Sequence, residues 1–140
     1  MKNEVTVEKL YQEHVWVIKA FSIEPASVDA WEKIVREYIR HMGGPQRYLV
    51  YDLTPIARPG LTVYMNRRVT ALAYDNRDAA GRVGIALNLN PTVRYVFEPF
   101  IRFTSVQLQP KVDARLFHTR NDAMNWVVDS LPPEIRAAGA

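Results

Sequence analysis

The residues best placed to do chemistry lie at the end of one apolar segment, residues 48–53, and in the loop that follows it. Such a segment is typical of a buried parallel strand, and ligands of open α/β sheets bind beside the carboxyl ends of these strands. Asp52 is the only acid at such a position, and Thr54, Arg58 and Thr62 are the loop residues suited to bind a ligand or carry a switch. A carboxylate there could act as a general acid or base. The alternative, which we prefer, is that Asp52 accepts hydrogen bonds from the loop amides after it.

The sequence lacks the other patterns on which catalysis and metal binding commonly depend. It contains no cysteine, which excludes a disulfide, a thiolate zinc site and a cysteine nucleophile. The three histidines, His14, His41 and His118, match no metal-binding spacing. There is no Gly-x-Ser-x-Gly, Gly-x-Gly-x-x-Gly or P-loop motif. We therefore predict a protein that is not an enzyme, with no metal site and no cofactor.

Charge and hydropathy narrow the range of partners. The net charge is +3 and is shared evenly by the two halves of the chain, whereas nucleic-acid binders gather their basic residues on one face. We therefore do not favour a nucleic-acid partner, although the adjacent Arg67 and Arg68 form the densest cluster of basic residues in the sequence. No run approaches the roughly 18 apolar residues of a membrane span. The N-terminal residues do not resemble a signal peptide, so the cytoplasm is the expected location.

Apolar and polar residues recur with the spacing of strands and helices. Residues 5–12 and 15–23 are predicted to form a β-hairpin, the first strand at an edge and the second more buried. An apolar stripe at helical spacing then predicts a helix that Ser27 caps and Gly43 ends.

The rest of the chain repeats a strand followed by a helix. Strands are predicted at residues 48–53, 82–89 and 114–117, and helices at about residues 61–74, 90–100 and 119–131. In the first of these helices Met65 and Val69 are expected to face inward, and Thr119 is expected to cap the last one. The small residues of the second of these strands suit close packing by a helix. Asn90 and Pro91 form a helix start signal, and Pro99 predicts a kink or an end. Residues 104–113 look irregular, and the tail, residues 132–140, is expected to fray.

The predicted order is therefore β-β-α-β-α-β-α-β-α in a single domain, with a core over about residues 5–131. Strands that alternate with helices form right-handed crossovers and a largely parallel sheet. The predicted fold class is α/β: a mixed, mostly parallel five-stranded sheet with an N-terminal antiparallel hairpin and four helices.

This order resembles the SpoIIAA-like branch of the STAS superfamily, the sulfate transporter and anti-sigma-factor antagonist domains. The opening hairpin followed by a helix is the first similar feature. The second is the segment 48–54, an apolar strand that ends in Asp-Leu-Thr, and the third is the segment 114–127, a closing strand with Phe and a capped helix with Ala and Trp. The resemblance spans roughly residues 5–131.

The resemblance implies a regulatory domain, and it also shows where this chain departs from the family. Phosphorylatable members carry an Asp-Ser-Ser-Gly motif after the Asp-Leu-Ser/Thr strand. The matching loop here has no Asp-Ser pair, and Thr54 and Thr62 are its only hydroxyls, which speaks against a kinase-regulated switch. The related fold of lipid-transfer proteins implies a small apolar ligand as another function.

The helix after this strand forms part of the partner surface in the family, which implies a surface at Tyr64, Arg67 and Arg68. The alternative is that Met65 is core and the arginines are solvated. A homodimer through this helix or a sheet edge is equally open. Our leading expectation is a non-catalytic STAS-like regulatory or protein-interaction domain with a protein partner or a second copy. A domain that binds a small apolar ligand or lipid is the second hypothesis, and an enzyme that uses Asp52 is the third.

Overall fold

The strands form one five-stranded sheet in which the spatial order follows the sequence, β1-β2-β3-β4-β5. The computed structural model describes residues 4–140. The strands are β1 (Val5–Leu10), β2 (Val15–Ala20), β3 (Gln46–Asp52), β4 (Ala80–Ala86) and β5 (Lys111–Phe117). β1 pairs with β2 in the antiparallel direction, and all other neighbours are parallel. The predicted mixed sheet with an N-terminal hairpin is therefore confirmed.

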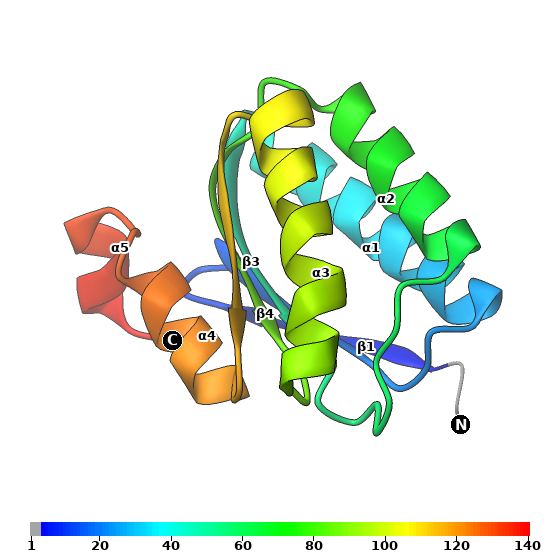
Figure 1. Ribbon diagram of the computed structural model, residues 1–140. Coiled ribbons are helices and arrows are strands. Elements are labelled where there is room, and N and C mark those ends of the chain that lie inside the picture. Colours follow the sequence, from blue (N-terminus) through cyan, green and yellow to red (C-terminus); the bar gives the residue numbers. More distant parts are fainter. Residues whose placement is uncertain (1–3) are drawn as a thin grey trace.

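Helices cover both faces of this sheet (Figure 1). They are α1 (Pro25–Met42), α2 (Val63–Asp75), α3 (Pro91–Phe103), α4 (Arg120–Val128) and α5 (Pro133–Ala138), with a π-helical turn, η1 (Thr104–Leu108), directly after α3. α1, α2 and α3 lie on one face, and α4 and α5 lie on the other. The first three each join neighbouring parallel strands, so successive right-handed crossovers place them on the same side. Over residues 4–140 no helix is long and apolar enough to cross a membrane.

The start of α1 differs from the prediction, because Ser27 does not cap the helix. The helix begins three residues earlier than predicted, at Pro25, with Glu24 in the N-cap position. Proline suits the first turn because its missing N–H would have no helical partner there. Ser27 is buried instead, and its hydroxyl shares a 2.7 Å hydrogen bond with that of Ser22. Gly43 ends the helix with a left-handed φ of 71°, as predicted.

α3 continues past Pro99 to Phe103, so the expectation of an end at the proline is wrong. A proline in a helix removes the N–H that would bind the carbonyl four residues earlier. That carbonyl belongs to Tyr95, which is 82% exposed, and Pro99 is exposed too. Water can therefore satisfy the carbonyl, which makes the proline tolerable on this face.

The last third of the chain is also more regular than predicted. The segment expected to be irregular contains η1, and β5 begins at Lys111 rather than at residue 114. The tail contains a fifth helix, α5, where no helix was predicted. Ile135 of α5 packs against the core on the α4 face, and Arg136 donates a hydrogen bond to the Asp129 carbonyl at 3.1 Å. These contacts give the short helix tertiary support that no local pattern in the sequence indicates.

Side chains between the sheet and α4 are packed densely. The residues there that are at most 1% exposed include Val15, Val17, Val50, Ala86, Ala123 and Val127. Gly84 of β4 lets the helix approach, because a Cβ on it would lie only 3.1 Å from the Cβ of Ala123. The prediction that this strand admits a closely packed helix is confirmed.

Candidate functional site

Asp52, the acid singled out in the sequence, is engaged by its own loop. It is 3% exposed, and its Oδ1 accepts hydrogen bonds from the Thr54 amide at 3.0 Å and the Thr54 hydroxyl at 2.6 Å. This is the hydrogen bonding to loop amides that we preferred over a catalytic role. Thr62 accepts from the Met65 amide at 3.0 Å and so caps α2, while Arg58 lies exposed in the same loop. Asp52, Thr54 and Thr62 therefore serve local structure.

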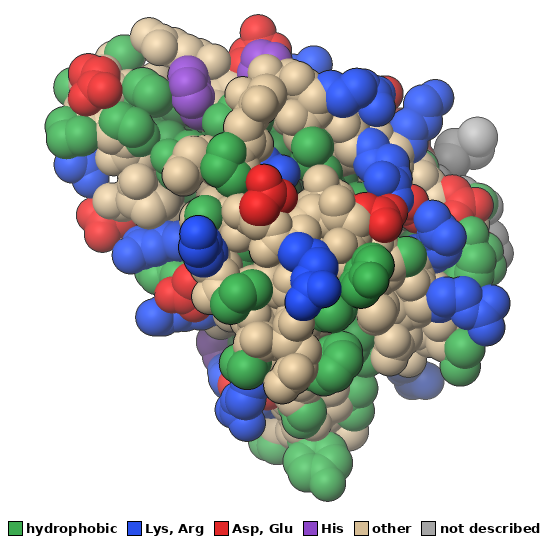
Figure 2. All heavy atoms as spheres, turned by 90° about the horizontal axis from the view of Figure 1, so that it is seen from above, with side chains coloured by type: hydrophobic (Ala, Val, Ile, Leu, Met, Phe, Trp, Pro, Cys, Tyr) green, Lys and Arg blue, Asp and Glu red, His purple; other side chains and the backbone are tan. Residues whose placement is uncertain are grey.

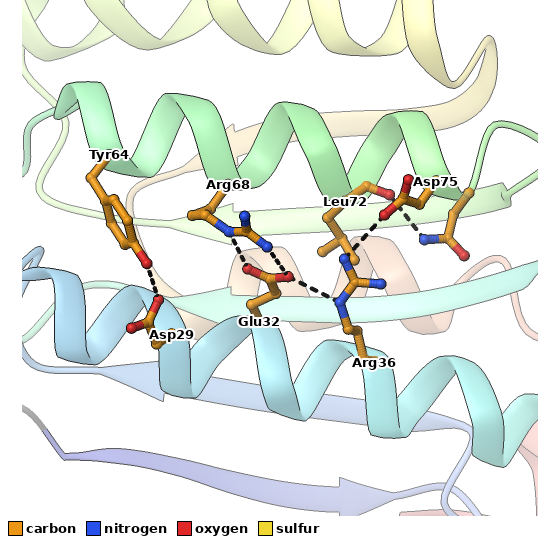
Figure 3. A network of polar contacts seen from close by, with 8 residues as sticks. Asp29, Glu32, Arg36, Tyr64, Arg68, Leu72 and Asp75 are labelled. Atoms are coloured by element: carbon orange, nitrogen blue, oxygen red, sulfur yellow. Dashed lines mark hydrogen bonds and ion pairs between the residues drawn. The ribbon is translucent and has the colours of Figure 1, made fainter.

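Two of the three residues of the expected partner surface, Tyr64 and Arg68, lie along the contact between α1 and α2 (Figure 3). Tyr64 donates a hydrogen bond to Asp29. Arg68 binds Glu32 through two parallel hydrogen bonds, from Nε to Oε1 and from Nη2 to Oε2, each 2.7 Å long. Of the three residues expected at this surface, Arg67 alone is exposed, and the other two are half-buried. Tyr64 and Arg68 therefore hold two helices of the same chain together.

We call this group of side chains the α1–α2 seam; it consists of Asp29, Glu32, Arg36, Tyr64, Arg68 and Asp75. Within it Arg36 donates to Glu32 at 2.9 Å and to Asp75 at 3.2 Å. Glu32 is 7% exposed. The hydrogen bond from Arg68 is the main cause that lowers the pKa of Glu32, and Arg36 acts in the same direction against the opposing effect of burial. The seam thus holds a charged carboxylate between two guanidinium groups.

An apolar cavity of about 190 Å³ lies between the sheet and the layer formed by α1, α2 and α3. Its sheet wall includes Leu49, Tyr51, Val83, Ile85 and Ala114, and its helix wall includes Trp31, Val35, Met65, Val69, Phe97 and Phe100. None of the described residues that line it is acidic. For comparison, an engineered apolar cavity of about 150 Å³ is large enough to bind benzene.

The cavity exists because most of α2 does not pack directly against the sheet. Only Leu72 and Ala73 of this helix are buried. Met65 and Val69, which were expected to be inward core residues, are half-buried and line the cavity. The seam attaches α2 to α1 through polar groups (Figure 3), and the cavity lies between this helix layer and the sheet.

Polar groups gather at the end of the cavity where β3, β4 and β5 begin. Gln109 donates to the Asn76 carbonyl at 3.0 Å, and both residues line the cavity. Arg47 also lines it and is 5% exposed; its Nη1 donates to the carbonyls of Gly44, at 2.7 Å, and Gln46, at 3.0 Å. Burial lowers the pKa of Arg47, but arginine stays protonated in proteins. The cavity is therefore apolar along its length and cationic at one end.

Figure 2 looks onto the end of the molecule that is uppermost in Figure 1. Basic and acidic side chains are interspersed over this surface, with exposed apolar side chains between them. No single-sign field of the kind that steers nucleic acid is visible on this face.

Tyr51 occupies the sheet wall two positions beyond Leu49. Its ring meets that of Trp31 edge to face, with 5.5 Å between centroids and 83° between planes. Burial raises the pKa of Tyr51, which keeps the phenol neutral. Its hydroxyl makes no hydrogen bond to another residue in the described part of the chain.

The cavity residues Arg47 and Tyr51 were not recognised from the sequence. We expected the strand to begin at residue 48 and considered only its carboxyl end. The period of two in a β-strand supplies the signal that could have found them, because Arg47, Leu49 and Tyr51 must share one face. A charged residue in register with an inward apolar row indicates a buried cation.

Among residues 4–140 no group of three or more His, Asp or Glu side chains is placed to hold a metal ion. Comparisons of the chain with protein-family models, with curated proteins and with solved structures gave no match.

Proposed function

We propose that this protein is a binding domain for a small apolar ligand, which it holds in the cavity between the sheet and α1, α2 and α3. The observation that carries the proposal is the cavity itself, about 190 Å³ in volume and walled mainly by aliphatic and aromatic side chains. Pockets of this composition, with few polar groups, are typical of sites for small molecules.

The energetics of an empty apolar cavity support the proposal. Loss of packing around a closed void costs about 24 cal/mol per Å³, so a closed void of this size would cost on the order of 5 kcal/mol. That is a large part of the stability of an ordinary domain. A ligand that fills the cavity restores the missing contacts.

A STAS-like regulatory domain is the second proposal, and it is compatible with the first. The strand order, with its N-terminal antiparallel hairpin and helices after each later strand, supports it. Because the loop after β3 lacks the family's Asp-Ser pair and Thr62 caps α2, occupancy of the cavity replaces phosphorylation as the signal in this proposal. A protein partner or second copy would then respond to the position of α2, where Arg67 is exposed.

Ligand binding is tested by filling the cavity from within. We expect 1-octanol, an uncharged probe, to shift the NMR signals of Leu49, Val83 and Val69 in a saturable manner. Val69→Phe places a ring in the cavity and should abolish this binding without unfolding the protein.

Val63→Phe is the matched control, because it makes the same change on the same helix at a residue that is 76% exposed. Equal binding by both variants, or shifts confined to the outer surface, would show that the cavity is not the site.

A further inference from the structure

Arg47 and Arg68 use the two edges of the guanidinium group in different ways. Nε–H and one N–H of Nη2 point in parallel, and this fork matches the two oxygens of a carboxylate. Arg68 uses the fork in full, since both of its hydrogen bonds to Glu32 are 2.7 Å long (Figure 3). Arg47 binds protein only through Nη1, which donates to two backbone carbonyls. Its fork makes no hydrogen bond to any residue between positions 4 and 140.

The unused fork faces open space. In the described part of the chain, every side-chain nitrogen or oxygen atom that is shielded from solvent has a hydrogen-bond partner. Nε and Nη2 of Arg47 have no such partner, so they are not fully shielded by protein atoms, even though the residue as a whole is only 5% exposed. The open space that Arg47 lines is the cavity.

No carboxylate of the described residues forms a hydrogen bond or a salt bridge with this cation, although Asp78 acts on it electrostatically over a longer distance. None lines the cavity, and none pairs with Arg47. A buried charge without a counter-ion in direct contact is unfavourable, and natural proteins commonly pair such groups or bind ions with them. The two backbone carbonyls compensate part of the charge and orient the group, but they leave the edge that suits a carboxylate unoccupied.

We propose that the ligand is a monocarboxylate, whose two oxygens accept the Nε–H and Nη2–H bonds of Arg47 while its apolar body fills the cavity between β3 and α2. This inference rests on the proposed function and adds the chemical class of the ligand. The Arg68–Glu32 pair shows the same contact made within the protein. The cavity volume, about 190 Å³, suits the apolar body of an aryl or medium-chain acid.

The test compares two probes that share an apolar chain and differ in the head group, octanoate and 1-octanol, by isothermal titration calorimetry. We expect the wild-type protein to bind octanoate at least about tenfold more tightly, since hydrogen bonds to charged groups contribute roughly 1.5–3 kcal/mol. Arg47→Met should erase this preference and leave the affinity for 1-octanol within about threefold of the wild type. The preference in the wild type should also fall as the pH is lowered through the pKa of the octanoate carboxyl group.

Arg82→Met is the matched control. Arg82 is also a strand arginine that donates through Nη1 to a backbone carbonyl, that of Trp126, but it does not line the cavity. This variant should keep the full preference for octanoate. Binding of 1-octanol by Arg47→Met shows that the variant is folded. If Arg47→Met does not fold, the pH dependence of the wild type and Arg47→Lys, which keeps the charge but loses the fork, provide the test.

The outcomes separate this inference from the proposed function. If neither probe binds, the proposed function fails and the inference fails with it. If 1-octanol binds but octanoate binds no more tightly, the cavity is a ligand site and the carboxylate inference is overturned. Retention of the preference for octanoate by Arg47→Met would overturn the role of Arg47.

Discussion

The two faces of the sheet are built from the same strands and packed in opposite ways. On one face α4 lies directly on β3 and β4, with Ala123 against Gly84 and Val127 fully buried. On the other face α2 is held to α1 by the seam, and Met65 and Val69 line a cavity rather than fill it. The difference shows that a helix can be positioned by polar contacts to its neighbour, and not only by apolar contact with the sheet. The face covered by α4, the dense face, is closely packed, and the face covered by α1, α2 and α3, the hollow face, contains the cavity.

The largest expected effect comes from overfilling the dense face. Gly84→Val should lower the free energy of unfolding by about 3 kcal/mol, because even its first added carbon would lie 3.1 Å from Ala123. Ala114→Val, on the neighbouring strand but facing the cavity, should change it by less than about 1 kcal/mol. Urea denaturation measures both. Similar losses for the two variants would mean that the faces are equally packed.

Removing atoms should also lower the free energy of unfolding more on the dense face than on the hollow face, but the difference should be smaller. Val127→Ala leaves a new void beneath α4 and should cost about 2 kcal/mol. Val69→Ala removes atoms that already border empty space, so it should cost under about 1 kcal/mol. Thermal and urea unfolding provide the measurement, and a greater loss for Val69→Ala would contradict the comparison.

The smallest expected effect concerns the seam. Its carboxylate, Glu32, has a lower pKa in the folded protein than its ordinary value of 4.5. The folded state therefore binds fewer protons than the unfolded chain, so this contribution is present above pH 4.5 and disappears as the pH falls through the lowered pKa. Glu32→Gln should reduce stability by about 1 kcal/mol at neutral pH and flatten the decline in acid.

Glu37→Gln is the control for this prediction, because Glu37 lies on the same helix and is exposed. Urea denaturation from neutral pH to about pH 3 should show that the free energy of unfolding of this control falls with pH as it does in the wild type. A Glu32→Gln variant with the same acid dependence as the wild type would exclude the seam as its source.

Much of the fold could be predicted because the signals are local. The order of strands and helices, the hairpin, the glycine that ends α1 and the caps Asn90 and Thr119 were read from periodicity and capping residues, and the structure has them. The errors lie where tertiary contacts override local preference. α5 is supported by Ile135, and α3 passes Pro99 because its outer face meets water.

The candidate site could be predicted only in part. Met65 and Val69 were expected to face inward, and they do, but no periodicity indicates whether an inward side chain meets another side chain or a void. Tyr64 and Arg68 were assigned to the surface, and their partners, Asp29 and Glu32, are 35 and 36 residues away in sequence.

By itself, the sequence determined which side chains point to which face, since strand and helix periods follow from backbone geometry alone. The same period puts Arg47 on the side of β3 that carries Leu49 and Tyr51, once the strand is known to begin at Gln46 rather than at residue 48. Only the tertiary structure decided that α2 stays beside α1, that a cavity opens beneath it, and that the Arg47 fork meets no carboxylate of the described chain. The physical reason is that cavities and unpaired charges depend on the distances between elements, and those distances result from packing among residues far apart in sequence.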